Sequence, residues 1–111
     1  MEVKAEAKNI AIAPRKVRLV LDTVRGKKVE EALALLKFTP TPISKVVAKV
    51  VKSAAANAEN NFQLTPADLK IVKIFADEGR TSKRHRPGAR GRVNMVLKRS
   101  SHITVVVAEE G

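Results

Sequence analysis

Two histidines are the residues of this chain best suited to proton transfer. His85 lies within a basic run and His102 within a largely apolar stretch. Neither has a carboxylate or thiol close to it in the sequence that would make it an activated base. We therefore expect His85 to act as a further hydrogen-bond donor to a nucleic acid, and His102 to be a packed or hydrogen-bonded strand residue.

Asp77 and Glu78 are the carboxylates that could in principle hold a divalent ion. Adjacent residues of a strand point to opposite faces, so one site rarely uses both. The chain has no cysteine, and it carries neither a phosphate-cradling loop nor a dinucleotide-binding glycine pattern. The sequence predicts no enzyme activity, no cofactor and no metal site. A nuclease or RNA-modifying enzyme with a pocket near His102 or Asp77 remains as an alternative.

The chemistry that the sequence does carry is basic, and it is concentrated between positions 80 and 99. The chain has a net charge of +11, and eight of its 22 Lys and Arg residues lie in this segment, which has no acid. They are Arg80, Lys83, Arg84, Arg86, Arg90, Arg92, Lys98 and Arg99. Six of the eight are Arg, whose planar guanidinium makes bidentate phosphate contacts and stacks on bases. Because like charges this dense repel one another, we expect an RNA or DNA contact surface rather than a solvated loop.

A second basic surface is expected on the body of the protein. Arg15, Arg18 and Arg25 fall on the side of the predicted first helix away from its apolar stripe, with Lys16 nearby. Lys45, Lys49 and Lys52 form a row on the predicted third helix. A solvated helix face explains these residues equally well.

Stacking of bases on aromatic rings is not expected to contribute to recognition. The chain has three Phe, no Tyr and no Trp, whereas readers of single-stranded RNA use exposed aromatic rings. Phe38, Phe62 and Phe75 all adjoin apolar residues and are predicted to be core residues. Recognition is then expected to use phosphates, grooves and shape.

The elements that must position these residues are readable from hydrophobic periodicity. Alternation over 3–11 predicts a strand with one wet face. Pro14 and an apolar stripe of Val17, Val20, Leu21 and Val24 predict a helix over 14–25, with Gly26 placed to end it. Glu30 and Glu31 open a second helix that ends near Phe38, with Val29, Leu33 and Leu36 as its stripe.

A third and longer helix is predicted from Pro42 to about Asn60. Thr41 is placed to cap it, and Val46, Val47, Val50 and Ala54 form its buried stripe. The small side chains of 53–56 let another backbone approach closely, so this helix is expected at the centre of the fold. Thr65 and Pro66 predict one extra helical turn.

Two β runs follow, and we expect them to form an antiparallel hairpin. The first starts at Leu69, with Val72, Ile74 and Ala76 on one face and Ile71, Lys73 and Phe75 on the other; the second spans 93–107. With an apex near Pro87 and Gly88, each arm would have about 18 residues and a length of about 60 Å.

The fold class predicted is α+β. Three helices are packed on a small antiparallel β-sheet made of the N-terminal strand and the two C-terminal strands, with a long protruding basic β-hairpin. Residues 1–111 are expected to form one domain, with 80–92 as the distal hairpin extension. No apolar run approaches the roughly 18 to 20 residues that span a bilayer, and no export signal is visible at the N-terminus, so we expect a cytoplasmic protein without a membrane partner.

Four motifs in order resemble those of a known family. Residues 13–18 (APRKVR) resemble an opening helix motif, and 53–61 (SAAANAENN) a central helix. Residues 89–92 (ARGR) resemble a hairpin tip, and 98–105 (KRSSHITV) a returning strand. Together the motifs resemble the bacterial large-subunit ribosomal protein family called L-twenty-two, and the likeness covers essentially the whole chain.

The resemblance implies a structural component of the large ribosomal subunit that binds large-subunit rRNA of the 23S type. The body would lie near the polypeptide exit, the hairpin would line the nascent-chain tunnel, and the protein would support subunit assembly. Partners would be the rRNA, neighbouring large-subunit proteins and the nascent polypeptide, with no small-molecule substrate and a monomer outside the ribosome. An organellar ribosome is left open. The tunnel-tip loop would comprise Arg86, Pro87, Gly88, Ala89, Arg90 and Gly91.

Two positions depart from the family pattern. Ala13 stands where the family usually has Ser, so the first helix lacks a side-chain cap and is expected to be less stable by about 1 kcal/mol. Gly88 stands where the family often has a basic residue, which removes one expected tip contact.

A DNA-architectural protein of the histone-like bacterial type is the strongest rival interpretation. Such proteins also use long basic β arms with a proline near the tip to bend duplexes. That alternative predicts an obligate dimer that prefers bent or nicked DNA, whereas the ribosomal interpretation predicts a monomer that binds large-subunit RNA tightly.

Overall fold

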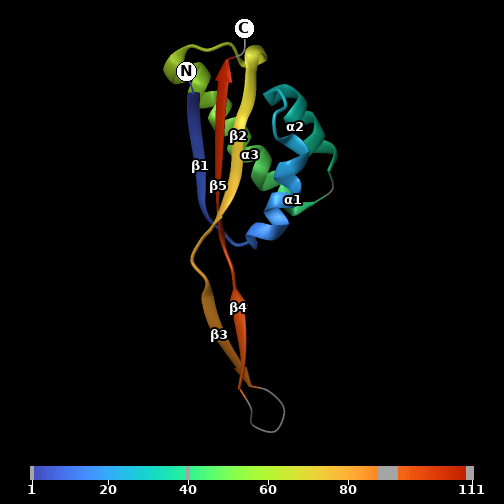
Figure 1. The fold of residues 1–111 in the computed structure, drawn as a ribbon, viewed down its shortest axis with the longest axis vertical. Helices are drawn as coiled ribbons and strands as arrows, with labels where there is room; N and C mark the ends of the chain where they lie inside the picture. The colour runs from blue at the N-terminus through green and yellow to red at the C-terminus, as the bar shows by residue number, and fades with distance from the viewer. Residues whose placement is uncertain (1, 40, 88–92, 110–111) are drawn as a thin grey trace.

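The computed structural model describes residues 2–39, 41–87 and 93–109; of residues 82, 84–87 and 93–97 it describes the backbone alone. The elements in chain order are β1 (Glu2–Ile10), α1 (Pro14–Val24), α2 (Val29–Phe38), α3 (Pro42–Phe62), a 3-10 turn (Pro66–Asp68), β2 (Leu69–Glu78), β3 (Ser82–Pro87), β4 (Val93–Lys98) and β5 (Ser101–Glu109). The predicted α+β class, with three helices on a small antiparallel sheet and a protruding hairpin, is confirmed (Figure 1).

The body is a two-layer sandwich of helices on one face of a three-stranded sheet. The strand order is β1-β5-β2, and both pairings are antiparallel. The remaining strands, β3 and β4, form a second, two-stranded sheet and extend the long axis of the molecule (Figure 1). The molecule measures 64 Å along this axis against 26 and 17 Å. β1 begins and β5 ends at the end of the body remote from the hairpin.

β5 is the central strand, and its inward side chains define the rows of the core. Ile103, Val105 and Val107 are fully buried. Each lies between a residue of β1 and one of β2, so that Val105, for example, is flanked by Ala5 and Ile74. The small residues on β1 leave space for α3, whose Ala54 and Ala58 are fully buried. The predicted central place of α3 in the fold is therefore confirmed.

The helix boundaries follow the signals in the sequence closely. The Thr41 side chain caps α3 by accepting a hydrogen bond from the Ser44 N–H, whereas Ala13 at the start of α1 makes no side-chain cap bond, as predicted. α3 ends at Phe62, two residues later than predicted, because Gln63 adopts a left-handed conformation with φ of 55° that terminates it.

The predicted faces of β2 are partly wrong. Ile71 is fully buried and Val72 is 41% exposed, the reverse of the predicted assignment, while Ile74 and Ala76 are buried as predicted. The cause is a register irregularity between Ile71 and Lys73, where two residues of β2 oppose one step of β5. A bulge of this kind reverses which residues face the core on one side of it. Counting every second residue as buried therefore gives the wrong face there.

The prediction that the phenylalanines are core residues is wrong for all three. Phe38 is 81% exposed, Phe62 46% and Phe75 40%. Phe38 and Phe62 are the last residues of α2 and α3, beyond the buried stripes of their helices, and Phe75 lies on the sheet face that the helices leave uncovered. Apolar neighbours in the sequence did not distinguish the covered face from the open one.

Candidate nucleic-acid interface

A basic hollow lies where the body meets the hairpin. It has a volume of about 560 Å³. The N-terminal turn of α1, the end of β2 and the segment between β4 and β5 contribute its lining, which consists of Ala13, Pro14, Arg15, Lys16, Arg18, Glu78 and Arg99. Four cations and one carboxylate share this space, so the hollow favours an anionic ligand.

The start of α1 adds to the positive potential of the hollow. Pro14 is its first residue, and no acid lies in its first turn. The partial positive charge that a helix carries at its N-terminus is therefore not offset by a local carboxylate. The backbone and the side chains both make the potential positive here, because Arg15, Lys16 and Arg18 belong to the first turns of α1.

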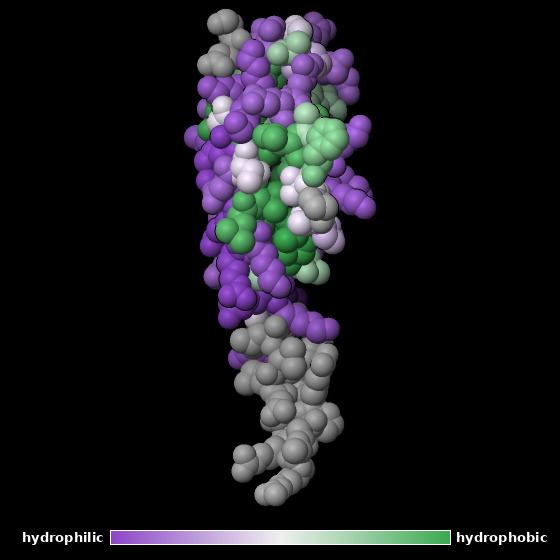
Figure 2. Space-filling model, turned by 90° about the vertical axis from the view of Figure 1, so that its right-hand side faces the viewer, coloured by the Kyte–Doolittle hydropathy of each residue, from purple (hydrophilic) through white to green (hydrophobic). Residues whose placement is uncertain are grey.

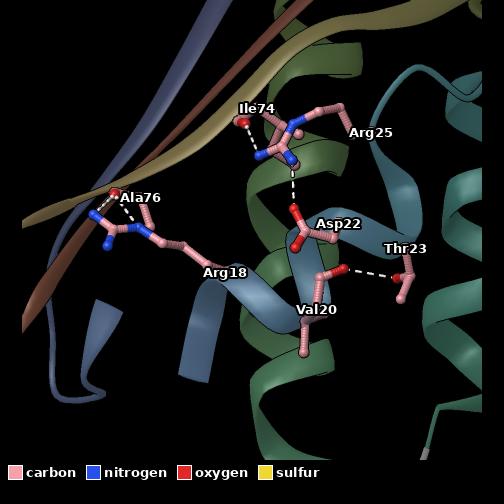
Figure 3. A network of polar contacts seen from close by, with 7 residues as sticks. All are labelled: Arg18, Val20, Asp22, Thr23, Arg25, Ile74 and Ala76. Carbon is pink, nitrogen blue, oxygen red and sulfur yellow. Dashed lines mark hydrogen bonds and ion pairs between the residues drawn. The ribbon is translucent and has the colours of Figure 1, made fainter. Parts of the chain in front are cut away.

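Arg18 also fixes the position of α1 against the sheet (Figure 3). Its Nε and Nη2 donate to the Ala76 carbonyl oxygen at 3.2 and 2.9 Å. Arg25, two turns later, donates through Nη2 to the Ile74 oxygen at 3.0 Å and pairs through Nη1 with Asp22. β2 is an edge strand, so these guanidinium groups bind carbonyls that no neighbouring strand pairs.

Arg18 and Arg25 are thus not simple solvated cations. The edge of β2 is further covered at its other end, where the Ile71 N–H donates to the Lys27 oxygen at 2.9 Å. A guanidinium has five donors, so Arg18 keeps donors for a ligand in the hollow after binding Ala76. Arg25 lies outside the hollow lining, and its described contacts tie α1 to the sheet.

The joint between the sheet and the hairpin is closely packed. The Gly79 N–H donates to the Ser100 oxygen at 2.9 Å, and the Ser100 hydroxyl donates to the Arg80 oxygen at 2.7 Å. A Cβ on Gly79 would lie 2.5 Å from the Ser100 Oγ, so only glycine fits without a shift. The buried Ser101 donates its hydroxyl to the Ile12 oxygen and ties the loop before α1 to the same joint. The position of Arg99 relative to α1 is therefore set by packing.

His102 has a structural role, as predicted. Its Nδ1 accepts a hydrogen bond from the Asn9 N–H at 3.0 Å. Asn9 has a positive φ of 58°, which marks the distorted end of β1. Asp77 is the register partner of His102 across β2 and β5. Among the residues that the structure describes, no three His, Asp or Glu side chains are grouped so that they could hold a metal ion.

The other predicted binding residues are distributed along the hairpin. Arg80, Lys83, Lys98 and Arg99 are exposed. Arg84, His85 and Arg86 lie on β3, where their register partners on β4 are Val96, Met95 and Asn94. Of the predicted tip loop, Arg86 and Pro87 belong to β3, whereas Gly88, Ala89, Arg90 and Gly91 lie outside the described residues, as does Arg92.

The hollow joins two groups that the sequence presented as separate surfaces. Arg15, Lys16 and Arg18 were expected on the body, and Arg99 on the hairpin. Their meeting, and the participation of Glu78, were not predicted. The sequence did contain a signal for this meeting. Gly79-Arg80 interrupts the first β run and Arg99-Ser100 interrupts the second, and the two interruptions lie opposite each other when the runs pair.

One carboxyl on the open sheet face has a shifted pKa. Lys4 donates a hydrogen bond to Glu6, with 2.9 Å between Nζ and Oε1, and this bond together with the charge of Lys4 lowers the pKa of Glu6 below its ordinary value. The two residues lie on the same wet face of β1, where alternation places them.

No helix among the residues that the structure describes is long and apolar enough to cross a membrane.

Comparison with known proteins gives a consistent result. Residues 5–108 match the sequence family described as Ribosomal protein L22p/L17e. A protein named large ribosomal subunit protein uL22 from Dehalococcoides mccartyi strain BAV1 is 66% identical over 109 residues, which cover 98% of this chain and 100% of the relative. A protein of the same name from Pediococcus pentosaceus is 59% identical over 107 residues, covering 96% of this chain and 91% of the relative.

Proposed function

We infer, from the premise that the chain belongs to the ribosomal protein L22p/L17e family, that it binds large-subunit rRNA through the basic hollow and the hairpin together. Membership makes it a structural protein of the large ribosomal subunit and not an enzyme, and it removes the ground for a histone-like DNA-bending protein. The further proposal concerns which residues contact RNA and what the hairpin does.

The observation that carries the proposal is the continuity of the basic surface across the joint. The hollow gathers Arg15, Lys16, Arg18 and Arg99 at the base of the hairpin. From there Arg80, Lys83 and Lys98 continue as exposed residues toward β3 and β4. An elongated molecule with its charge along the protruding part fits a groove between RNA segments better than a flat duplex surface.

The roles follow from the chemistry of each group. Arg15, Lys16, Arg18 and Arg99 would neutralise phosphates at the joint, while Arg25 would bind RNA only through the donors that Asp22 and Ile74 leave free. The hairpin residues Arg84, His85, Arg86, Arg90 and Arg92 would contact RNA along the extension. The tip, Arg86 to Gly91, would line the nascent-chain tunnel, and the binding of several RNA segments by one protein would support subunit assembly.

A salt titration tests the RNA interface. The purified protein is titrated with large-subunit rRNA, and with duplex DNA of matched charge, at several salt concentrations. We expect tighter binding to the rRNA that persists near physiological salt; equal affinities that fall together would indicate a non-specific polycation.

A triple variant localises the interface to the hollow. R15Q/K16Q/R99Q should reduce the slope of log affinity against log salt by about two units, since each lost phosphate contact removes somewhat less than one unit. The matched control K8Q/K28Q/K73Q removes three exposed charges outside the hollow and outside the two predicted basic surfaces. Equal changes in both variants would contradict a defined interface at the hollow.

The tunnel proposal has a separate test. Because the chain has no cysteine, G88C would introduce a unique thiol at the predicted tip. In ribosomes stalled on a nascent chain that carries a thiol-reactive group, we expect cross-linking to G88C and none to K8C on the body. The converse result would place the tip away from the nascent chain.

A further inference from the structure

A second hollow lies on the body, between α2 and α3. Its volume is about 520 Å³, within the range of about 300 to 1,000 Å³ typical of ligand pockets. The lining residues are Leu33, Ala34, Leu36, Lys37, Thr39, Ser44, Lys45, Ala48 and Lys52. It shares no lining residue with the basic hollow at the hairpin joint.

The chemistry of this hollow differs from that of the hollow at the joint. Its floor is apolar, with Leu33 and Leu36 from α2 and Ala48 from α3. Lysines stand on both sides: Lys37 belongs to α2, and Lys45 and Lys52 belong to α3. None of the described lining residues is acidic. An occupant must therefore offer apolar groups to the floor and carboxylates to both margins.

Exposed apolar surface continues beyond the hollow on α2. Phe38 follows Ala34 by four residues and so lies beside it on the helix surface, and it is 81% exposed. Apolar side chains gather on the helix side of the body, bordered by hydrophilic ones (Figure 2). A large exposed aromatic residue beside an apolar hollow marks a contact surface.

We propose that the hollow between α2 and α3, with Phe38 at its margin, binds an acidic amphipathic helix of another protein. Such a helix lays its apolar stripe into a groove between two helices. Lys45 and Lys52 are seven residues apart on α3, about 10.5 Å along its axis, so carboxylates spaced by seven residues on the incoming helix face both ammonium groups. The apolar floor disfavours RNA, because phosphates placed against Leu33 and Leu36 would lose bound water without gaining a hydrogen bond. This proposal does not rest on the RNA-binding function.

The test uses a labelled synthetic peptide and the full-length chain. The peptide is an 18-residue helix with Leu on one stripe and Glu on both flanks, and the comparison peptide has the same composition with the stripe scrambled. We expect fluorescence anisotropy to detect binding of the first peptide alone. Binding of both peptides with equal affinity would overturn the proposal, because charge alone would then explain it.

Two variants and a matched control localise the binding. K45E/K52E should weaken binding of the striped peptide by about tenfold or more, the equivalent of about 1.4 kcal/mol. K8E/K73E makes the same change of charge on exposed residues outside the hollow and should alter the affinity by less than about twofold, as expected for distant charges screened by salt. Equal losses in both would overturn the proposal.

The second variant leaves the charge unchanged. Ala34 is exposed and lines the hollow, so A34F occupies the groove without entering the core. It should abolish peptide binding and leave the affinity for large-subunit rRNA unchanged. If A34F instead lowered rRNA affinity and spared the peptide, RNA would be the occupant and the proposal would be wrong.

Discussion

The body and the hairpin are built from the same two β runs but are stabilised differently. In β2 and β5 the inward side chains are buried beneath the helices, with Ile71, Ile103 and Val107 fully excluded from solvent. Within the described part of the chain, β3 and β4 form a separate two-stranded sheet. An isolated two-stranded hairpin is marginally stable in water. The comparison teaches that the body is stabilised by its buried core, whereas the hairpin would gain stability from the polyanionic partner proposed above.

The border between the two regions is short and well defined. Gly79 and Ser100 face each other where β2 gives way to β3 and β4 to β5. On the body side of this pair the inward side chains of Ala76 and Ile103 are buried. On the other side, residues 80–99 contain no acid. The basic hollow lies at the border and belongs to both regions.

The largest effect is expected from removing the charge of the hairpin. R84Q/R86Q/R90Q/R92Q should flatten the salt dependence of rRNA binding by about three units of slope, because each phosphate contact contributes somewhat less than one. The body should stay folded, since all four lie in the sequence between β2 and β5, outside the helices and the three-stranded sheet. Filter-binding titrations measure the slope and circular dichroism measures folding, and K8Q/K28Q/K37Q/K73Q controls for the loss of four exposed charges. An unchanged slope would mean that the hairpin binds no phosphates.

A substitution that leaves a cavity in the core of the body is expected to lower folding stability, whereas the hairpin variant is expected to lower RNA binding alone. Leu21 is fully buried in α1, and Leu21→Ala should lower the free energy of unfolding by about 2 to 5 kcal/mol through lost burial and an unfilled cavity. Urea denaturation followed by circular dichroism measures this loss. Leu19→Ala is the control, because Leu19 is 71% exposed on the same helix. Similar losses in both would show that α1 is not packed as described.

Arg18 has a role in each region: it attaches α1 to β2 in the body, and it lines the basic hollow at the base of the hairpin. Arg18→Met should lower the free energy of unfolding by about 1 kcal/mol, since the Ala76 carbonyl loses a charged donor. Arg15→Met should change it by less than about 0.5 kcal/mol, as is usual for surface substitutions. Both should weaken rRNA binding. Equal stabilities in urea denaturation would mean that the Arg18 bond contributes nothing to the attachment of α1.

The smallest effect concerns Glu6 on the open face of β1. Its pKa is lowered by the hydrogen bond and charge of Lys4. A carboxyl with a lowered pKa in the folded state stabilises the protein above its unfolded pKa, and this contribution is lost as the pH falls through the folded pKa. Lys4→Met should therefore raise the Glu6 pKa toward its ordinary value. Carbon-13 NMR titration of the carboxyl group measures it, and an unchanged value would exclude Lys4 as the cause.

Much of the fold was readable from local signals. Pro14, Thr41 and Pro42 mark helix starts through their own backbone or capping chemistry, and these starts agree with the structure. The alternation in 3–11 likewise predicted β1. Each signal depends on residues within a turn or two, so no knowledge of tertiary contacts was required. The basic, acid-free stretch was also visible, because charge density is a property of the chain itself.

The predictions that were wrong concerned burial, which depends on contacts between elements that are distant in the sequence. Val72 and Ile71 exchange faces because a bulge is fixed by pairing with β5, and Phe38, Phe62 and Phe75 are exposed because no element covers their positions. In the same way, the helix arginines and Arg99 meet only because the sheet order brings α1 to the joint. The sequence by itself determined the elements and the segment that carries the charge, since these follow from local propensity and composition. Only the tertiary structure decided which faces are buried and that Arg18 binds the edge of β2, because these depend on contacts between segments far apart in the sequence, such as Arg18 and Ala76, which are 58 residues apart.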